Sequence, residues 1–259
     1  MCDKDIQYAI KVDGVYKAYE EQTDDAERDY VLKNVSLNIK ENEFICALGP
    51  SGCGKSTMLN LIAGYIKPNQ GSIEIYGEKV EGASGKAGVV FQDHALLPWL
   101  TVKKNVALGP KMNHKKDADE IANKYIKMVG LEGLENAYPK SLSGGMAQRV
   151  GIARALANEP RVLLMDEPLG ALDALTRENM RQEILKIWQE TNTTIFFITH
   201  SVQEAVYLAD RVILLKNGGI ECDVKIDIER PRRVKNEKFM EYVDFFEKKI
   251  SGNSTATSD

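Results

Sequence analysis

Short apolar runs recur along the chain, separated by glycine, proline or charged residues. The run Phe44–Leu48 has five residues and is bounded by glycine and proline, so it predicts a buried strand. Residues 162–165 and 194–199 form similar unbroken runs, which are typical of strands that a parallel sheet buries on both faces. A further buried strand is predicted at 212–215, after a short helix.

Other segments alternate apolar and polar residues, which is the period of a half-buried strand. Near the N-terminus this alternation predicts an antiparallel pair, and residues 20–29 form a polar, mostly acidic loop within it. Strands are also predicted at 71–77 and 88–92, and strict alternation with charged residues at 220–228 predicts one long two-faced strand. The apolar positions of the N-terminal pair are Ile10, Val12, Val35, Leu37 and Ile39.

Apolar residues at helical spacing predict the helices. One helix follows the first buried strand, and the spacing at 121, 125, 128 and 129 predicts a helical lobe, inserted at about 93–158. Further helices are predicted at 147–157, 176–190 and 237–250. The last is amphipathic; docking on the domain is expected, and a partner surface is the alternative.

The composition suits one folded domain. With 259 residues, of which 43% are hydrophobic, the chain can bury a sizeable core. We expect a single domain over 1–250 and a disordered tail at 251–259. The predicted fold class is α/β, with a mixed, largely parallel sheet, an N-terminal antiparallel β subdomain and the inserted α-helical lobe.

Charge, cysteines and hydropathy exclude several functions. A formal net charge of −4 argues against nucleic acid as a partner. The four cysteines have no C-x-x-C spacing, so neither a disulfide framework nor a zinc site is indicated, and a reducing, cytosolic setting fits best. No run approaches the ~18 apolar residues of a membrane span, and the N-terminus lacks a signal-peptide layout. Any membrane role is therefore expected to come through a partner.

The most specific motif lies between the first buried strand and its helix, where residues 49–56, GPSGCGKS, match G-x-x-x-x-G-K-[ST]. Its glycines permit positive φ and close backbone approach, so N–H groups can surround a polyphosphate at a helix N-terminus. Lys55 is expected to reach the β- and γ-phosphates, and Ser56 to ligate Mg²⁺. A glycine turn with an unrelated lysine is the alternative. The predicted nucleoside triphosphate site comprises Gly49, Pro50, Ser51, Gly52, Cys53, Gly54, Lys55, Ser56 and Thr57, with Thr57 near the nucleotide but not a metal ligand.

Other predicted strands end in residues that suit phosphate chemistry. Because side chains alternate along a strand, Asp166 can face a metal while Glu167 faces elsewhere. Asp166 is predicted to hold Mg²⁺ and Glu167 to act as general base, with a structural acidic pair as the alternative. His200 leaves the carboxyl end of a central strand, where open α/β sheets bind ligands, and is a candidate γ-phosphate contact. Gln92 also follows a strand.

Two further residues have alternative interpretations. Ser143 can cap the helix after it and so form a second anion site, but an ordinary helix start explains the same residues. Tyr19 could cover an adenine, although without further context an ordinary edge-strand tyrosine is favoured.

The order and spacing of these motifs resemble the nucleotide-binding subunit of an ATP-binding-cassette (ABC) transporter, and the resemblance covers nearly the whole chain. The matching elements are GPSGCGKST, Gln92, LSGGM at 142–146, VLLMDEP at 162–168, GALD, and ITH ending at His200. Met146 departs from the glutamine most often found there. Because the serine and glycine N–H groups would contact phosphate, we expect little loss of activity.

The resemblance implies a P-loop NTPase fold, with ATP and Mg²⁺ as ligands. Tyr19 would stack on adenine, Gln92 would sense both Mg²⁺ and the membrane partner, and His200 would link the γ-phosphate to Glu167. The implied catalytic residues are Glu167, His200, Lys55 and Gln92, and the implied metal site is Ser56, Gln92 and Asp166.

The resemblance also implies partners. Ser143, Gly144 and Gly145 would contact the γ-phosphate held by a second copy of the chain, so that two chains enclose two ATP molecules head to tail. Asp173 would lie across that interface.

Three segments narrow the resemblance to importers of nitrate, sulfonates, taurine and related small solutes: LLPWLTV at 96–102, LSGGM, and RPR at 230–232. The segment around Pro98 and Trp99 would meet an integral membrane permease, although Trp99 could instead belong to the lobe core. The chain would lie peripherally at the cytoplasmic face of the cell membrane and depend indirectly on an extracytoplasmic solute-binding protein. The solute itself is not encoded, because the cassette never touches it.

Rival assignments fit less well. A chromosome-maintenance or DNA-repair ATPase head needs a long coiled coil after Gln92, but only 50 residues separate Gln92 from Ser143. A P-loop kinase would lack LSGG and ITH. An exporter or lipid-extraction ATPase subunit remains the main alternative.

Overall fold

The computed structural model describes residues 8–19 and 29–252. The predicted loop at 20–29 and tail at 251–259 therefore lie mostly outside the described residues. In the described ranges no helix has both the length and the apolar character needed to cross a membrane.

The N-terminal strands form a four-stranded antiparallel sheet in the order β2-β1-β4-β5. Its strands are β1 (Tyr8–Lys17), β2 (Leu32–Lys40), β4 (Gln70–Ile75) and β5 (Glu78–Lys79). Pairing of Val12 with Leu37 confirms the predicted antiparallel pair.

The second sheet has six strands in the order β10-β9-β3-β8-β7-β6, and all its pairs are parallel except β9–β10. The prediction of a mixed, largely parallel sheet is confirmed. The strands are β3 (Phe44–Leu48), β6 (Ala87–Val90), β7 (Val162–Asp166), β8 (Thr194–Ile198), β9 (Arg211–Lys216) and β10 (Gly219–Lys225).

The expectation of one long strand at 220–228 was wrong, because β10 ends at Lys225. Its neighbour β9 begins at Arg211, directly opposite Lys225, so the next residues have no strand to pair with. The Ile226 side chain is nevertheless buried, with 4% of the residue exposed. Its N–H donates to the Asp210 carbonyl.

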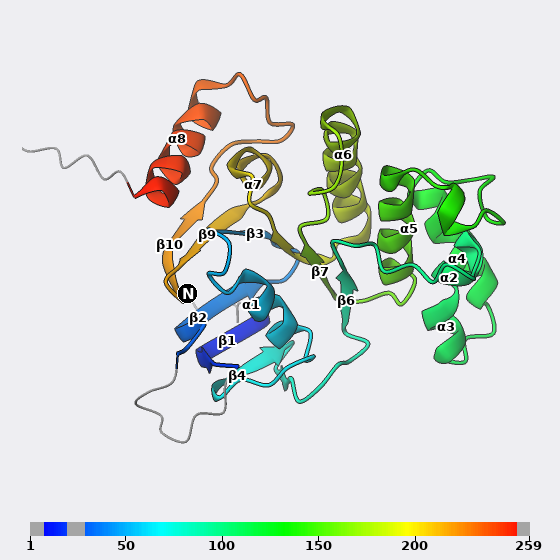
Figure 1. The fold of residues 1–259 in the computed structure, drawn as a ribbon, viewed down its shortest axis with the longest axis horizontal. Coiled ribbons are helices and arrows are strands. Elements are labelled where there is room, and N and C mark those ends of the chain that lie inside the picture. The colour runs from blue at the N-terminus through cyan, green and yellow to red at the C-terminus, as the bar shows by residue number, and fades with distance from the viewer. Residues whose placement is uncertain (1–7, 20–28, 253–259) are drawn as a thin grey trace, which may run out of the picture.

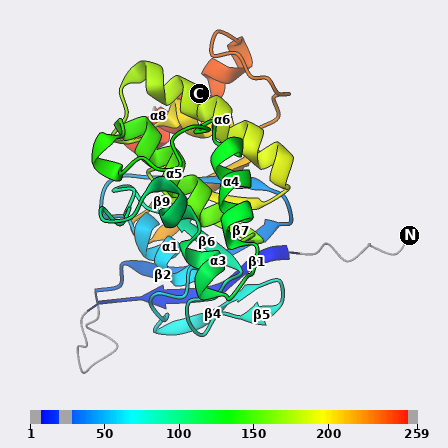
Figure 2. The same ribbon diagram turned by 90° about the vertical axis from the view of Figure 1, so that its right-hand side faces the viewer.

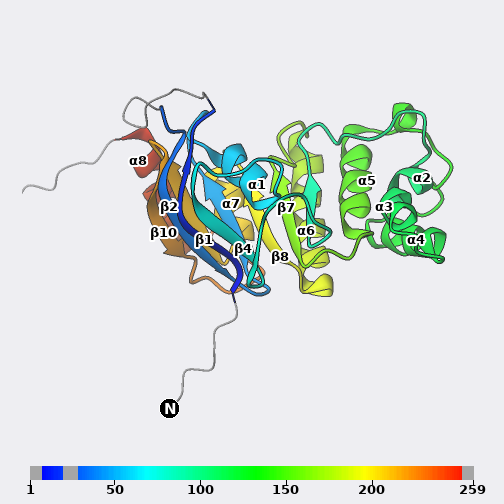
Figure 3. The ribbon, with the colours of Figure 1, turned by 90° about the horizontal axis from the view of Figure 1, so that it is seen from below.

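Four helices, α2 to α5, occur between β6 and β7 and gather at one end of the molecule (Figures 1 and 3). They are α2 (Val102–Val106), α3 (Leu108–Met112), α4 (Ala118–Met128) and α5 (Gly144–Leu156). The helix predicted at 147–157 begins earlier, at Gly144, because the Ser143 side chain caps its first turn.

The other helices cover the six-stranded sheet. They are α1 (Lys55–Ile62), α6 (Ala174–Thr191), α7 (Val202–Leu208) and α8 (Glu237–Ser251). Figure 2 shows α6 and α8 on one side and the antiparallel strands β1, β4 and β5 on the other. The apolar side of α8 is buried through Phe239, Val243 and Phe246, as expected for a helix docked on the domain.

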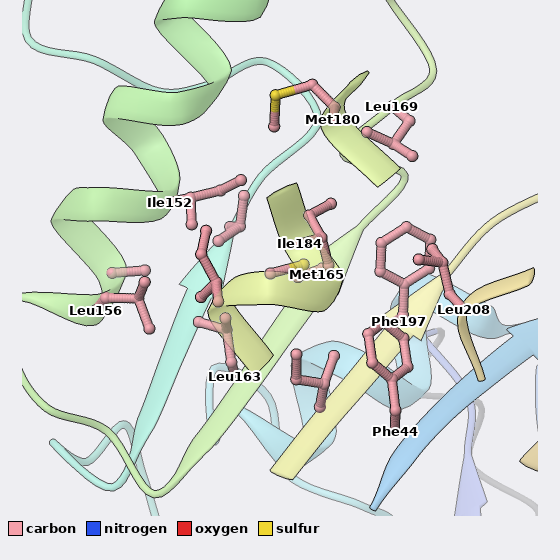
Figure 4. Close-up of a cluster of buried hydrophobic side chains, with 14 of the residues drawn as sticks. Phe44, Ile152, Leu156, Leu163, Met165, Leu169, Met180, Ile184, Phe197 and Leu208 are labelled. Atoms are coloured by element: carbon pink, nitrogen blue, oxygen red, sulfur yellow. The ribbon is translucent and has the colours of Figure 1, made fainter. Parts of the chain in front are cut away.

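Strict alternation of side chains along the parallel strands builds two cores. In β3, Phe44, Cys46 and Leu48 join a cluster with helices α4 to α8. Ile45 and Ala47 point the other way, into a cluster with α1 and the antiparallel sheet. Figure 4 shows the first cluster, where Phe44 and Phe197 lie beside each other. Burial on both faces explains why these strands read as unbroken apolar runs.

Parallel pairing brings the carboxyl ends of four strands to one edge of the sheet. The chain leaves β3 at Gly49, β6 shortly before Gln92, β7 at Glu167 and β8 shortly before His200. Residues far apart in the sequence are therefore neighbours at this edge.

Candidate nucleotide-binding site

The phosphate loop adopts the backbone conformation that its glycines predict. Gly49, Gly52 and Gly54 have φ values of 152°, 78° and 101°. A Cβ on Gly49 would lie 2.3 Å from the Leu215 carbonyl oxygen, and one on Gly54 would lie 2.6 Å from Leu32 Cδ2. Packing and backbone conformation thus both require glycine at these two positions.

Lys55 is held inside the loop. Its side chain is buried, and Nζ donates to the carbonyls of Gly49 and Pro50, both at 2.8 Å. Cys53 is also buried, with Sγ 3.9 Å from the same Nζ. The positive charge is therefore fixed within the ring of backbone groups where a polyphosphate is expected.

Ser56 and Asp166 form a pair of oxygen ligands. Ser56 Oγ donates to Asp166 Oδ1 at 3.2 Å, and burial is the main reason why the pKa of Asp166 is raised. Hard oxygen atoms of this kind suit Mg²⁺, which binds through few protein groups and keeps phosphate and water oxygens. Within the described ranges no three His, Cys, Asp or Glu side chains are grouped as a metal site.

Glu167 and His200 face each other, with His200 Nδ1 3.3 Å from Glu167 Oε2. The two acidic side chains have different partners, since Asp166 pairs with Ser56 and Glu167 with His200. Glu167 has a φ of 43°, in the left-handed region, so the chain turns out of β7 at this residue. A strained backbone of this kind is common at functional sites.

Gln92 lies close to the same carboxylate. A Cβ on Gly170 would be 3.6 Å from Gln92 Nε2 and 3.8 Å from Glu167 Oε2, so both polar groups border the space above this glycine. The structure thus brings Gln92, Glu167 and His200 together at the sheet edge, as the strand ends predict.

Tyr19 is not packed as an ordinary edge-strand residue. Its side chain is 59% exposed, and its hydroxyl hydrogen-bonds to Thr57 Oγ1 at 3.0 Å on the phosphate helix α1. Lys17 Nζ lies 5.7 Å from the centroid of the Tyr19 ring. The ring therefore stands beside the phosphate loop with much of its surface accessible.

The LSGGM stretch does not join the phosphate loop of the same chain. Ser143 is exposed and accepts a hydrogen bond from the Met146 N–H at 3.3 Å, as predicted for a cap. Figure 1 shows α5 among the lobe helices, whereas α1 lies between the two sheets. Gly145 is buried against α6, where a Cβ would lie 2.5 Å from Thr176 Cγ2.

Asp173 caps α6 by accepting hydrogen bonds from the N–H groups of Leu175 and Thr176 at 3.1 and 3.0 Å. The Thr176 N–H bond is the main reason why the pKa of Asp173 is lowered. Asp173 is exposed at the start of the helix whose Thr176 lies against Gly145, and its place across an interface stays a prediction.

Sequence reasoning missed Asn105, a fully buried side chain in α2. Its Oδ1 accepts from the Leu97 N–H, and its Nδ2 donates to the carbonyls of Leu97, Leu100 and Thr101 at 3.1, 3.0 and 3.0 Å. The loop that it holds carries Trp99, which is 69% exposed and so does not belong to the lobe core. The sequence does contain a signal for Asn105, because it is a polar residue on the side of a short helix that faces the core.

A family model described as ABC transporter matches residues 32–170. The chain belongs to this family. It is 51% identical over 237 residues to an uncharacterized ABC transporter ATP-binding protein of Methanocaldococcus jannaschii, covering 90% of this chain and 88% of that protein. It is 42% identical over 234 residues to an aliphatic sulfonates import ATP-binding protein of Bacillus cereus, covering 90% and 92%.

The fold is similar to a solved dimeric ATP-binding cassette in a post-hydrolysis state bound to ADP and Pi. The TM-score is 0.74 at 38% identity, covering 85% of this chain and 100% of the other. The predicted family, the cassette fold and the ATPase activity are thereby confirmed.

Proposed function

We propose that this chain powers uptake of a small sulfonate-like solute, as the ATPase subunit of an importer. The observation that carries the catalytic part is the convergence of the phosphate loop, the Ser56–Asp166 pair and the Glu167–His200 pair at one sheet edge. The import direction is supported by the relative named for import of aliphatic sulfonates.

In the proposed reaction the polyphosphate of ATP lies against the N–H groups of the phosphate loop, with Lys55 beside it and Tyr19 against the adenine. Ser56 and Asp166 would hold Mg²⁺, with Gln92 near it, and the ion when bound would supply charge neutralisation for the phosphates. Glu167 accepts a proton from a water molecule while the oxygen of that water attacks the γ-phosphorus. The bond between the γ-phosphorus and the oxygen of the leaving ADP breaks in the same step. His200 orients Glu167 and contacts the γ-phosphate.

The test of this chemistry is Glu167→Gln, which preserves shape but removes the base. We expect ATP binding to remain within a few-fold of the unchanged chain and steady-state phosphate release to fall by at least about a hundredfold. Normal turnover would assign the base to another residue.

Each complete site is proposed to need two chains. Ser143, Gly144 and Asp173 are exposed at the starts of α5 and α6 and not on the phosphate helix α1, so a second copy could reach them. The solved relative is described as dimeric. Light scattering of Glu167→Gln should give a dimer with ATP and a monomer without it. Ser143→Arg should block that dimer because it adds bulk and charge at the helix start.

A separate membrane permease is the proposed second partner, and the exposed Trp99 its contact. The chain would then lie at the cytoplasmic face of the membrane. Co-purification of the tagged chain from native membranes should recover a permease, and Trp99→Ala should reduce its yield while the ATPase of the isolated chain stays unchanged.

The solute is proposed to be an aliphatic sulfonate, delivered by an extracytoplasmic binding protein. Uptake of a labelled sulfonate by vesicles that contain the purified complex tests this directly, with nitrate as the competing candidate. Transport only out of the compartment that holds ATP would favour the exporter alternative.

A further inference from the structure

Two loops must be aligned for Glu167 and His200 to face each other. Glu167 starts the turn at 167–173 between β7 and α6, and His200 lies between β8 and α7. The His200 side chain is 63% exposed, so little packing around it fixes its place. The contact between them, at 3.3 Å, therefore depends on how each loop is held.

The His200 loop is held by Glu204, a buried carboxylate in α7 that is 5% exposed. Thr199 Oγ1 donates to Glu204 Oε2 at 2.6 Å and accepts from the Ser201 N–H at 3.0 Å. Ser201 Oγ in turn accepts from the Glu204 N–H at 3.3 Å. Both neighbours of His200 are thus tied to one residue.

The Glu167 turn is held by Arg177 of α6. Arg177 Nε donates to the Leu169 carbonyl at 3.3 Å, and Nη2 donates to the Leu172 carbonyl at 2.8 Å. The Gly170 N–H closes the same turn on the Glu167 carbonyl at 3.1 Å. The planar guanidinium therefore fixes the backbone immediately after Glu167.

The two anchors meet each other, because Arg177 Nε lies 3.7 Å from Glu204 Oε1. An acidic side chain this buried is rare unless a cation compensates its charge. Arg177 does so while its Nε and Nη2 donate to the carbonyls of the turn. One ion pair consequently connects the backbone on either side of His200 to the backbone that follows Glu167.

We propose that Arg177 and Glu204 are positioning residues that set the alignment of Glu167 with His200 during ATP hydrolysis. This rests on the proposed roles of Glu167 and His200. Neither Arg177 nor Glu204 hydrogen-bonds to the phosphate loop, so the pair acts on the catalytic step and leaves ATP binding unaffected.

The test compares kcat and KM of the full chain with MgATP for Arg177→Met, Glu204→Gln and the double variant. Displacing a catalytic group by about 1 Å can cost about a hundredfold in rate. We expect each single variant to lower kcat about 10- to 100-fold, with KM for ATP changed less than about threefold. Because the residues act as one unit, the double variant should fall little further than the worse single variant.

Two variants separate positioning from lost stability. Arg177→Met leaves a buried carboxylate unpaired and lowers Tm, but the double variant removes both charges and is expected to fold. Arg181→Met is the matched control, since Arg181 is also on α6 but contacts Glu178 of α6 and the Tyr207 ring of α7, whose centroid is 5.1 Å from its guanidinium, and neither partner belongs to the two loops. It should lower Tm and leave kcat within about twofold.

The outcomes distinguish this inference from the proposed function. If Glu167→Gln is inactive but the folded double variant keeps normal kcat, the positioning role is refuted and the base assignment stands. A rise in KM with unchanged kcat, or an equal loss of kcat in Arg181→Met, also refutes it. If Glu167→Gln retains full turnover, the proposed base is refuted first.

Discussion

Gly145 offers a sharp test, because its residue type can be explained either by phosphate approach or by packing. An alanine here adds a Cβ that would lie 2.5 Å from Thr176 Cγ2. Thr176 cannot rotate freely, since a β-branched side chain in a helix has few χ1 rotamers and its N–H donates to the Asp173 carboxylate at 3.0 Å. The added methyl therefore has to push α5 away from α6.

The sign of the effect follows from two opposing magnitudes. Replacing a helical glycine by alanine normally stabilises by roughly 0.5–1 kcal/mol, whereas overpacking costs roughly 1–3 kcal/mol. The midpoints of these ranges predict a net loss of about 1 kcal/mol for Gly145→Ala. For a chain of this size that lowers Tm by about 2–4 °C in a thermal unfolding assay.

Two variants sharpen the result. Gly144→Ala is the control, because a Cβ there is 3.9 Å from Leu172 Cδ2, an ordinary contact, and its Tm should not fall. Thr176→Ser removes the methyl group and keeps the hydroxyl, so adding it to Gly145→Ala should restore Tm. The packing argument is refuted if Gly145→Ala is as stable as the unchanged chain, or if Thr176→Ser gives no rescue. ATPase activity that stays low in the rescued variant would assign Gly145 to phosphate contact as well.

The remaining predictions concern the buried amide, the α6 cap and the core. Asn105→Ala removes the donor to the Leu100 carbonyl and the acceptor of the Leu97 N–H, so solute uptake by the complex should fall more than the ATPase of the isolated chain, and equal losses would contradict this. The pKa of Asp173 is lowered from 3.8, so its contribution to stability is full above that pH and is lost as pH falls through the lower folded value. Asp173→Asn should remove this acid dependence in melts between about pH 5 and 2, and an NMR titration giving a pKa above 3.8 would refute it. Phe197→Ala should cost about 3–5 kcal/mol in chemical unfolding, because Phe197 is fully buried against Phe44.

The sequence predicted best those features that depend on short-range patterns. The strand Phe44–Leu48, the glycine loop and α1 were placed correctly, because a five-residue apolar run followed by a glycine motif has few other solutions. The grouping of Gln92, Glu167 and His200 was also predictable, since parallel strands end at one edge.

Features that depend on a distant partner were not predictable. The length of β10 is set by where β9 begins, and the turn at Glu167 is visible only in its φ of 43°. Gly145 matches a phosphate-contacting motif, but its contact with Thr176 arises from a packed helix pair. Each of these features depends either on a residue that is distant in the sequence or on a backbone angle, and a local sequence pattern reveals neither.

The polar residues that sequence reasoning missed share one physical role, which is to donate hydrogen bonds to loop carbonyls. Functional loops at strand ends have carbonyls that no helix or sheet satisfies, and a buried carbonyl without a donor is costly. Asn105 supplies donors to 97–101, Arg177 to 169–172, and Arg154 to the carbonyls of His94 and Ala95, which both have positive φ. All three donors sit on helices, so each loop is held by a rigid element rather than by its own sequence. A side chain with several donors on a helix beside a functional loop is therefore a candidate for holding that loop, and substitutions there should alter coupling or turnover before they alter nucleotide binding.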